Sequence, residues 1–348
     1  GQCTPEEVLP PLRAATEHYR RSARIGINQL SDGEPIVGFR RHNSNLLCQI
    51  DSCPVLEPRL DNLFAAIREQ LSTLGEIKHI TQLDVDLGDQ QGFLTVRHKK
   101  PLSADATQVF QQIAADYQLI LTLQSTKTGD AGMESLQPGT KTTVAYQLNG
   151  LTLNFNPGDF IQVNAQINQQ MVDQAITLLT PADGDQILDL FCGLGNFTLP
   201  LAQQGATVTG IEGSTAMVDQ AHLNARQNNL TNCEFHCANL AEDLSQLAWY
   251  RKTYNKIVLD PPRAGAHEII GQLCALKADN ILYIACNPGA LARDTATLQQ
   301  EGYRLQKFLV MDMFPHTHHI ESMALFVRGK KPAAKKKVIA GKKLWSKR

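Results

Sequence analysis

Apolar and polar positions change their spacing partway along the chain, and this change divides it into two regions. Between residues 183 and 327, short apolar runs alternate with stretches of helical apolar spacing. Four of the runs predict buried strands, at 186–190, 207–211, 256–260 and 281–285, and the last two end in Asp260 and Ala285. Helices are predicted at 215–228 and 288–301, and a last strand at 323–327. The alternation predicts an α/β fold with a doubly wound, mostly parallel sheet, which binds ligands at the carboxyl ends of its strands.

The first half of the chain has a different pattern. Its strand-like runs are 35–39, 77–87, 92–97, 119–123 and 142–155. Helical spacing covers 59–74 and 105–117. Strands with two interspersed helices predict a smaller α+β domain with an antiparallel sheet.

Turn signals set the expected domain boundaries. Asn149-Gly150 and Asn156-Pro157-Gly158 lie between the two patterns and favour turns. The expected organisation has four parts: an N-terminal remnant or linker at 1–18, the α+β domain at 19–155, the α/β domain at 156–328 and a basic flexible tail at 329–348.

Composition is that of a protein that forms a hydrophobic core. The 348 residues are 43% hydrophobic and 19% charged, without an apolar run long enough to span a membrane and without a signal pattern at residues 1–7. The eight cysteines are scattered, unlike those of a disulfide scaffold. We therefore expect a cytoplasmic monomer with reduced thiols and no membrane segment.

Charge is distributed unevenly. The last twenty residues hold nine Lys and Arg and no acid, whereas residues 1–328 hold 24 basic and 34 acidic residues, a net charge of -10. Such a tail is typical either of a polycation that contacts phosphates in a salt-sensitive way or of a solubilising extension.

A glycine loop follows the strand at 186–190. Gly193 and Gly195 would let the backbone pass close to a ligand, and Glu212, 19 residues after Gly193, ends the next strand, where it could accept hydrogen bonds from a ribose. The alternative is a structural turn. Thr198 stands where a dinucleotide fingerprint has its third glycine, which argues against an NAD-dependent oxidoreductase.

Two further strand ends carry candidate chemistry. Asp260-Pro261-Pro262-Arg263 is a rigid loop that presents an acid and a guanidinium, and its arginine stands where adenine-N6 methyltransferases have an aromatic residue. Cys286 follows the strand at 281–285, and Asn287-Pro288 then begins a helix whose N-terminus would favour a thiolate nucleophile over an inert core cysteine. The other cysteines, including Cys192, fit packing roles.

A histidine-rich segment precedes the last strand. His316, His318 and His319 do not have the spacing of a tetrahedral zinc site. Glu321, just before the strand, is better placed to act as a base near the site.

Five motifs together resemble one family. They are Phe160-Ile161-Gln162-Val163-Asn164, Asp189 to Asn196, Asp260 to Gly265, Cys286-Asn287-Pro288, and Phe314-Pro315-His316 through Glu321. In this order they resemble the RNA uracil-5-methyltransferases, most closely those that act on 23S rRNA. The resemblance covers roughly residues 19–328 and implies a Rossmann-like, S-adenosylmethionine-dependent methyltransferase domain preceded by an RNA-binding central domain.

The resemblance implies a covalent mechanism. Cys286 would add to C6 of a uracil flipped out of its stack, C5 would take the methyl group, and Glu321 would remove the C5 proton before Cys286 leaves. Asp260 and Arg263 would steady the charge that develops on the base. The implied cofactor residues are Gln162, Phe191, Gly193, Asn196, Glu212, Asn239 and Asp260.

Two features depart from the family pattern. Members of the rRNA type begin with a small β-barrel and three spaced cysteines that, with a fourth, hold a 4Fe–4S cluster. Cys53 resembles the fourth ligand, but only Cys3 lies upstream, so a complete cluster is expected only in a longer chain.

Arg20, Arg21 and Arg24 match a basic stretch of the family that would touch RNA phosphates or form a solvated face.

Two alternatives stay open from the sequence. A tRNA uracil-5-methyltransferase would share the cysteine and the glutamate, and an RNA-binding or assembly module with a dead transferase site would keep only the fold. The intact set of Cys286, Glu321 and Asp260 favours an enzyme.

Overall fold

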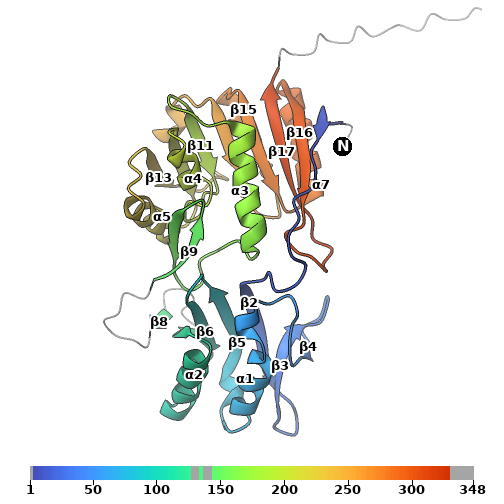
Figure 1. Cartoon of the computed structure of the whole chain (residues 1–348), viewed down its shortest axis with the longest axis vertical. Coiled ribbons are helices and arrows are strands. Elements are labelled where there is room, and N and C mark those ends of the chain that lie inside the picture. The colour runs from blue at the N-terminus through green and yellow to red at the C-terminus, as the bar shows by residue number, and fades with distance from the viewer. Residues whose placement is uncertain (1–2, 127–132, 136–142, 330–348) are drawn as a thin grey trace, which may run out of the picture.

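The protein has two large sheets joined by a hairpin. The computed structural model describes residues 3–126, 133–135 and 143–329, in which the strands form an eight-stranded, a seven-stranded and a two-stranded sheet. Figure 1 shows the two large sheets at opposite ends of the long axis, with the hairpin between them.

The eight-stranded sheet is doubly wound. In spatial order its strands are β1 (Glu7–Val8), β16 (Tyr303–Met311), β17 (Glu321–Arg328), β15 (Asn280–Ala285), β14 (Lys256–Leu259), β11 (Gln186–Leu190), β12 (Thr207–Glu212) and β13 (Cys233–Cys237). The strands from β15 to β13 run parallel, and β17 is antiparallel to both of its neighbours. The order reverses at β11, so a crevice opens between β11 and β14 at their carboxyl ends.

Helices cover both faces of this sheet. They are α3 (Ala165–Leu179), α4 (Thr198–Gln203), α5 (Thr215–Gln227), α6 (Ile270–Ala275) and α7 (Pro288–Gln300). Alternate residues of one strand enter different cores: Ile187 packs with α3, α4 and α5, while Leu188 packs with α6 and α7. Burial on both faces explains why these strands appear in the sequence as continuous apolar runs.

The predicted fold class is confirmed, with several elements added. The strands and helices predicted between 186 and 301 match the structure to within a residue or two at their ends. The sequence pattern missed β13, β16, α3, α4 and α6. In β16, charged residues and a bulge between Leu305 and Lys307 break the alternation, which hid the strand.

The seven-stranded sheet forms the first domain. In spatial order it contains β4 (Leu47–Gln49), β3 (Pro35–Arg40), β2 (Ser22–Gln29), β5 (Ile80–Leu87), β6 (Gly92–His98), β7 (Leu119–Ser125) and β8 (Met133–Ser135). All of its pairs are antiparallel except β6 with β7. Helices α1 (Leu63–Leu71) and α2 (Ala104–Asp116) pack on one face of it, over a core that includes Ile25, Phe64 and Phe110.

The hairpin belongs by its packing to the second sheet. Strands β9 (Val144–Leu148) and β10 (Leu151–Phe155) are joined by Asn149 and Gly150, both with positive φ, as a tight hairpin turn requires. Its apolar side chains share one core with α3, α4 and α5. We propose that the domain boundary precedes the hairpin instead of following it at residue 155.

The N-terminal segment extends the second sheet. The sequence predicts a remnant or linker at 1–18, but β1 pairs in parallel with β16, and Leu12 bridges to Met311. The basic tail lies outside the described residues, apart from Gly329. Among the helices of the described chain, none is long and apolar enough to cross a membrane.

Candidate active site

Four strand ends meet at the crevice of the doubly wound sheet. Phe191 follows β11, Glu212 ends β12, Asp260 follows β14 and Cys286 follows β15. Because parallel strands point the same way, these residues gather at one edge of the sheet. Glu321, the first residue of antiparallel β17, reaches the same edge.

The glycine loop turns sharply after β11. Three residues of the loop have positive φ: Phe191 at 62°, Gly193 at 56° and Gly195 at 101°. At Gly193 the positive φ would strain any side chain, and an added Cβ would lie only 3.3 Å from the Met217 side chain, so the position favours glycine. The loop is held by Asn196, whose side-chain amide exchanges two hydrogen bonds of 2.9 Å with that of Asn168.

Glu212 ties the loop to the next strand. Its carboxylate accepts hydrogen bonds from the backbone N–H groups of Gly193, Gly213 and Ser214 at 3.1, 2.8 and 3.1 Å. A carboxylate has about four acceptor positions, so one stays available to a ligand. Beside it lies a cleft of about 410 Å³, whose lining includes Phe191, Glu212, Asn239, Pro262, Ala264, Gly265 and Ala266.

Two acids, buried Asp189 and partly buried Asp260, lie near this cleft. Burial raises the pKa of Asp189 to about 7, although its Oδ2 accepts a 2.6 Å hydrogen bond from the Thr198 hydroxyl. Its other oxygen, Oδ1, is buried without a hydrogen-bond partner. Burial likewise raises the pKa of Asp260 to about 7, and Gln162 donates to this carboxyl at 3.2 Å.

Cys286 and Glu321 lie side by side at the end of one strand pair. Ala285 pairs with Ser322 in the β15–β17 ladder, so the next residues outward are Cys286 and Glu321. Burial, with the neighbouring Asp260 charge, raises the pKa of Glu321 to about 8. Burial and the charges of Glu321 and Asp260 also raise the pKa of Cys286. This direction is opposite to that expected from the helix N-terminus alone, because the sequence pattern does not reveal the two adjacent carboxyls.

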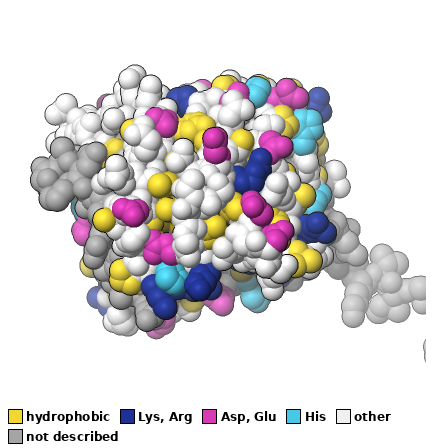
Figure 2. Space-filling view, turned by 90° about the horizontal axis from the view of Figure 1, so that it is seen from below, with side chains coloured by type: hydrophobic (Ala, Val, Ile, Leu, Met, Phe, Trp, Pro, Cys, Tyr) yellow, Lys and Arg dark blue, Asp and Glu magenta, His cyan; other side chains and the backbone are white. Residues whose placement is uncertain are grey.

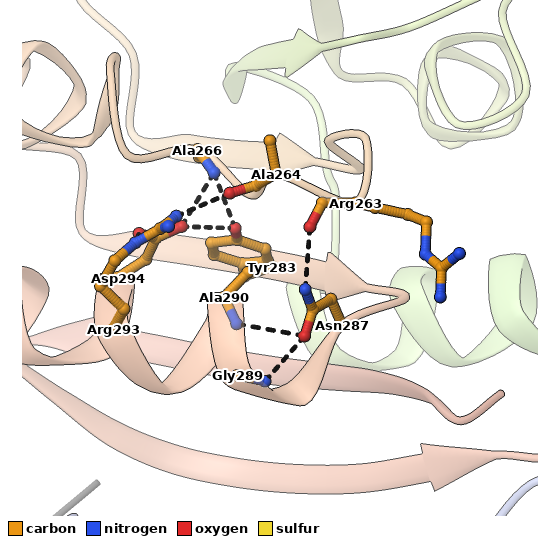
Figure 3. A network of polar contacts seen from close by, with 9 residues as sticks. All are labelled: Arg263, Ala264, Ala266, Tyr283, Asn287, Gly289, Ala290, Arg293 and Asp294. Atoms are coloured by element: carbon orange, nitrogen blue, oxygen red, sulfur yellow. Dashed lines mark hydrogen bonds and ion pairs between the residues drawn. The ribbon is translucent and has the colours of Figure 1, made fainter. Parts of the chain in front are cut away.

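The loop at 260–266 is fixed by residues of β15 and α7 (Figure 3). Asn287 donates to the Arg263 carbonyl at 3.0 Å, and Arg293 donates to the Ala264 carbonyl at 2.7 Å. Buried Asp294 accepts from the Ala266 N–H at 2.8 Å and from the Tyr283 hydroxyl at 2.7 Å. Hydrogen bonds thus fix the backbone of the loop at three residues, Arg263, Ala264 and Ala266.

Glycine is required at one point of this loop. Gly265 has a φ of 81°, and a Cβ there would come within 2.7 Å of Arg293 and Asp294. The Arg263 guanidinium extends away from the network in Figure 3 and lies 3.3 Å from Nδ1 of His319. The roles of Tyr283, Arg293 and Asp294 could not be predicted from the sequence, since they depend on contacts between distant segments.

Some predicted residues lie elsewhere. Of the predicted cofactor residues, Gln162, Gly193, Asn196 and Asp260 are not among those that line the cleft, and the Asn196 side chain is hydrogen-bonded to Asn168. The expected phosphate contact is wrong for Arg21, which is buried, stacks over the Tyr146 ring at 4.2 Å and donates to the Gln162 carbonyl at 2.7 Å. Arg24 is exposed, and Arg20 donates to the Ser22 carbonyl.

The cysteines present do not fit an iron–sulfur cluster. Cys53 packs beside the core of the first domain, whereas Cys3 contacts the core of the second and lies 3.0 Å from Nε2 of Gln299. Within the described ranges, no group of three or more His, Cys, Asp or Glu could hold a metal ion, and this includes the three histidines before β17. A 4Fe–4S cluster needs four such ligands.

The fold and the crevice define a class of enzyme. The sheet is doubly wound and has an antiparallel strand between β15 and β16, and a glycine loop follows β11 while an acid ends β12. This is the architecture of S-adenosylmethionine-dependent methyltransferases. The orphaned oxygen of Asp189 and the free acceptor position of Glu212 fit such a cofactor. The sequence model of the tRNA (uracil-5-)-methyltransferase family matches residues 12–329. The chain therefore belongs to this family, as its motifs predict.

Named relatives and one solved structure agree with this placement. The chain is 43% identical to the 23S rRNA (uracil(1939)-C(5))-methyltransferase RlmD of Hahella chejuensis over 335 residues, which span 94% of this chain and 74% of that protein. It is 41% identical to RlmD of Photobacterium profundum, with coverage of 97% and 70%. The tRNA (uracil-54, C5)-methyltransferase of Pyrococcus abyssi, crystallised with S-adenosyl-L-homocysteine, shares the fold, with a TM-score of 0.73 and 24% identity over 92% of this chain and 78% of that one.

Proposed function

We propose that the protein transfers a methyl group from S-adenosylmethionine to C5 of a uridine in 23S rRNA. The observation that carries the proposal is the placement of Cys286 beside Glu321, with Asp260 next to both, at the open edge of a methyltransferase sheet. The relatives named for 23S rRNA support the choice of RNA. A tRNA uridine is the second candidate, because the solved neighbour is named for tRNA.

The reaction needs a nucleophile because C5 of uracil is only weakly nucleophilic. The Cys286 thiolate adds to C6, which forms an S–C6 bond and places an electron pair on C5 and O4. S-adenosylmethionine, when bound, supplies an electrophilic methyl group that this C5 attacks. Arg263 stabilises the charge that develops on the uracil oxygen, and Asp260 helps to hold the base in place.

A base must then restore the aromatic ring. Glu321 takes the proton from C5, the electron pair of that bond forms the C5–C6 double bond, and the Cys286 sulfur leaves. The pKa of Glu321 is raised, so its ionised form is a stronger base than an ordinary carboxylate. The site is half-buried at Cys286, which limits the access of water to the reacting atoms.

The cofactor residues divide into two groups. Glu212 accepts from the ribose hydroxyls, and Phe191 and Asn239 contact the nucleoside across the cleft. Gly193 allows the close approach of the loop, and Gln162 and Asp260 lie toward the reacting end. Asn196 supports the loop from behind through Asn168.

Neutralising Glu212 is expected to weaken cofactor binding. Glu212→Gln keeps the shape of the side chain but replaces one acceptor oxygen by an NH2 group and removes the charge. Hydrogen bonds to the ribose and to the backbone of the glycine loop both weaken, so the Kd for S-adenosylhomocysteine should rise about 10- to 100-fold. Isothermal titration calorimetry measures this change. Glu301→Gln, an exposed glutamate after α7, is the matched control and should bind like the parent. Equal affinity of the two variants would remove Glu212 from the ribose site.

The rate is expected to rise with pH. Glu321 acts as a carboxylate and its pKa is about 8, so only about one tenth of the free enzyme carries the active form at pH 7. The raised pKa of Cys286 acts in the same direction, because the thiolate is the nucleophile. A plot of kcat/KM against pH should therefore climb between about pH 6.5 and 9, while RNA binding is checked at each pH. A profile that is flat or falls over this range would contradict the assigned base and nucleophile.

Nucleoside mass spectrometry tests the function directly. The protein is incubated with S-adenosylmethionine and either unmodified 23S rRNA or unmodified tRNA. We expect 5-methyluridine in the rRNA. Product in tRNA alone would replace the proposed substrate, and no product in either RNA from folded protein that binds S-adenosylhomocysteine would overturn the proposal.

A further inference from the structure

A basic groove crosses the open face of the first sheet. It has a volume of about 670 Å³, and its cations are Arg24 on β2, Arg40 at the end of β3, Lys78 before β5 and Lys99 after β6. All four residues are exposed. The lining includes amide side chains such as Asn28 and Asn45 but no Asp or Glu. We call this surface the sheet groove.

The strand pattern explains why the groove is polar. Along β2, Ala23, Ile25 and Ile27 are buried under the helices, while Arg24 and Asn28 point to the opposite, uncovered face. None of the four cations takes part in an ion pair within the described part of the chain. Their charge is therefore available to a ligand.

The groove differs from the neighbouring surface. Viewed from the end of the molecule that holds the first sheet, Lys and Arg side chains are interspersed with Asp and Glu (Figure 2). Even beside the groove, Arg24 also lines a smaller pocket that contains Asp84 and Asp86. Lys78 and Lys99 line the groove, which contains no acid, and do not line the smaller pocket with its two acids. Their positive charges are therefore the least offset in the groove.

A line of ring contacts runs from the loop after β3 to the active site. His42, two residues after Arg40, has its ring centroid 5.7 Å from that of His318. His318 lies 5.0 Å from His319 between ring centroids, and His319 lies 3.3 Å from Arg263. A row of polar rings thus runs from His42, close in sequence to Arg40, to the Arg263 guanidinium.

We propose that the sheet groove binds phosphates of the RNA strand that carries the target uridine, at a distance from the reacting base. The inference rests on the proposed function, and it adds a second anchoring site on a different domain. An unneutralised row of cations with amide donors fits a phosphodiester backbone, because such contacts position a nucleic acid without reading its sequence. The row His42, His318 and His319 lies along the path of the strand between the groove and Cys286.

The test removes the two clearest charges. Lys78→Gln/Lys99→Gln should weaken binding of a 23S rRNA transcript about 10-fold at 0.15 M salt and lower the slope of log Kd against log salt concentration by about 1.4, the value for two phosphate contacts on a single strand. In methylation assays KM for the transcript should rise by a similar factor with little change in kcat. Lys78→Arg/Lys99→Arg keeps both charges and should behave like the parent.

A matched control separates the groove from general charge effects. Arg226→Gln/Lys277→Gln removes two exposed cations outside the groove, one in the last turn of α5 and one after α6, and should leave the salt slope unchanged. The inference is overturned if Lys78→Gln/Lys99→Gln retains the parental slope and KM, as it would if the groove served an acidic protein partner. If the parent forms no 5-methyluridine at all, the proposed function fails, while the salt slope of RNA binding still decides the role of the groove.

Discussion

Replacement of Cys286 by alanine is expected to abolish the formation of 5-methyluridine, with a fall in rate of at least about three orders of magnitude. Without the sulfur, no bond forms at C6, and C5 keeps the low reactivity of free uracil. Cofactor binding should be unchanged, because Cys286 does not line the cleft beside Glu212. Single-turnover methylation of 23S rRNA, followed by nucleoside mass spectrometry, measures the loss.

Two controls make this result specific. Cys48→Ala changes an exposed cysteine on β4 and should retain full activity. Calorimetry with S-adenosylhomocysteine shows whether Cys286→Ala keeps its folded cofactor site. Residual activity above about one per cent of the parent would mean that another group attacks C6, and Cys286 would then be a packing residue.

A different outcome is expected for Glu321→Gln, which should trap the enzyme on its RNA. The amide cannot take the proton from C5, so methyl transfer proceeds but the Cys286 sulfur cannot leave. Turnover should fall by about 10²- to 10⁴-fold, the usual contribution of a general base. At the same time, a protein–RNA complex that survives denaturing electrophoresis should accumulate, and only when S-adenosylmethionine is present.

The trapped complex can be tested by its own chemistry. The double variant Cys286→Ala/Glu321→Gln should form no adduct, because the S–C6 bond requires the thiol. Glu301→Gln, an exposed glutamate on the same chain, should turn over normally without an adduct. If Glu321→Gln formed product at the parental rate, the base would have to be sought elsewhere, and Asp260 would be the nearest carboxyl.

The two variants probe one electrostatic arrangement. Three ionisable groups, Cys286, Glu321 and Asp260, crowd a half-buried edge. Burial raises the pKa of each, and neighbouring negative charge raises the pKa of Cys286 and Glu321 further. Ionisation of one group makes ionisation of the next less favourable. The active thiolate and carboxylate forms therefore accumulate only as the pH rises, and activity should increase with them. The network around Asp294 holds the Asp260 loop against this repulsion, because its hydrogen bonds fix the backbone at Arg263, Ala264 and Ala266.

Sequence patterns predicted the second domain better than the first. Strands such as β11 and β14 are buried on both faces, so they appear as unbroken apolar runs that few other structures produce. In contrast, β2 is a central strand of the first sheet, yet its alternation of Ala23, Arg24 and Ile25 is short and includes Gly26, and the pattern missed it. The parallel pairing of β6 with β7 was also not predictable, since register across a helical crossover is set by packing.

The sequence by itself determined the family, the fold class and the strand-end residues that form the candidate site. This was possible because parallel strands carry their chemistry at one edge, where Glu212, Asp260 and Cys286 follow apolar runs directly. Only the tertiary structure decided that Glu321 lies beside Cys286, that the side chain of Asn196 is hydrogen-bonded to that of Asn168, and that Arg21 is buried. These facts depend on the antiparallel insertion of β17 and on contacts between segments far apart in the chain, which local spacing does not record.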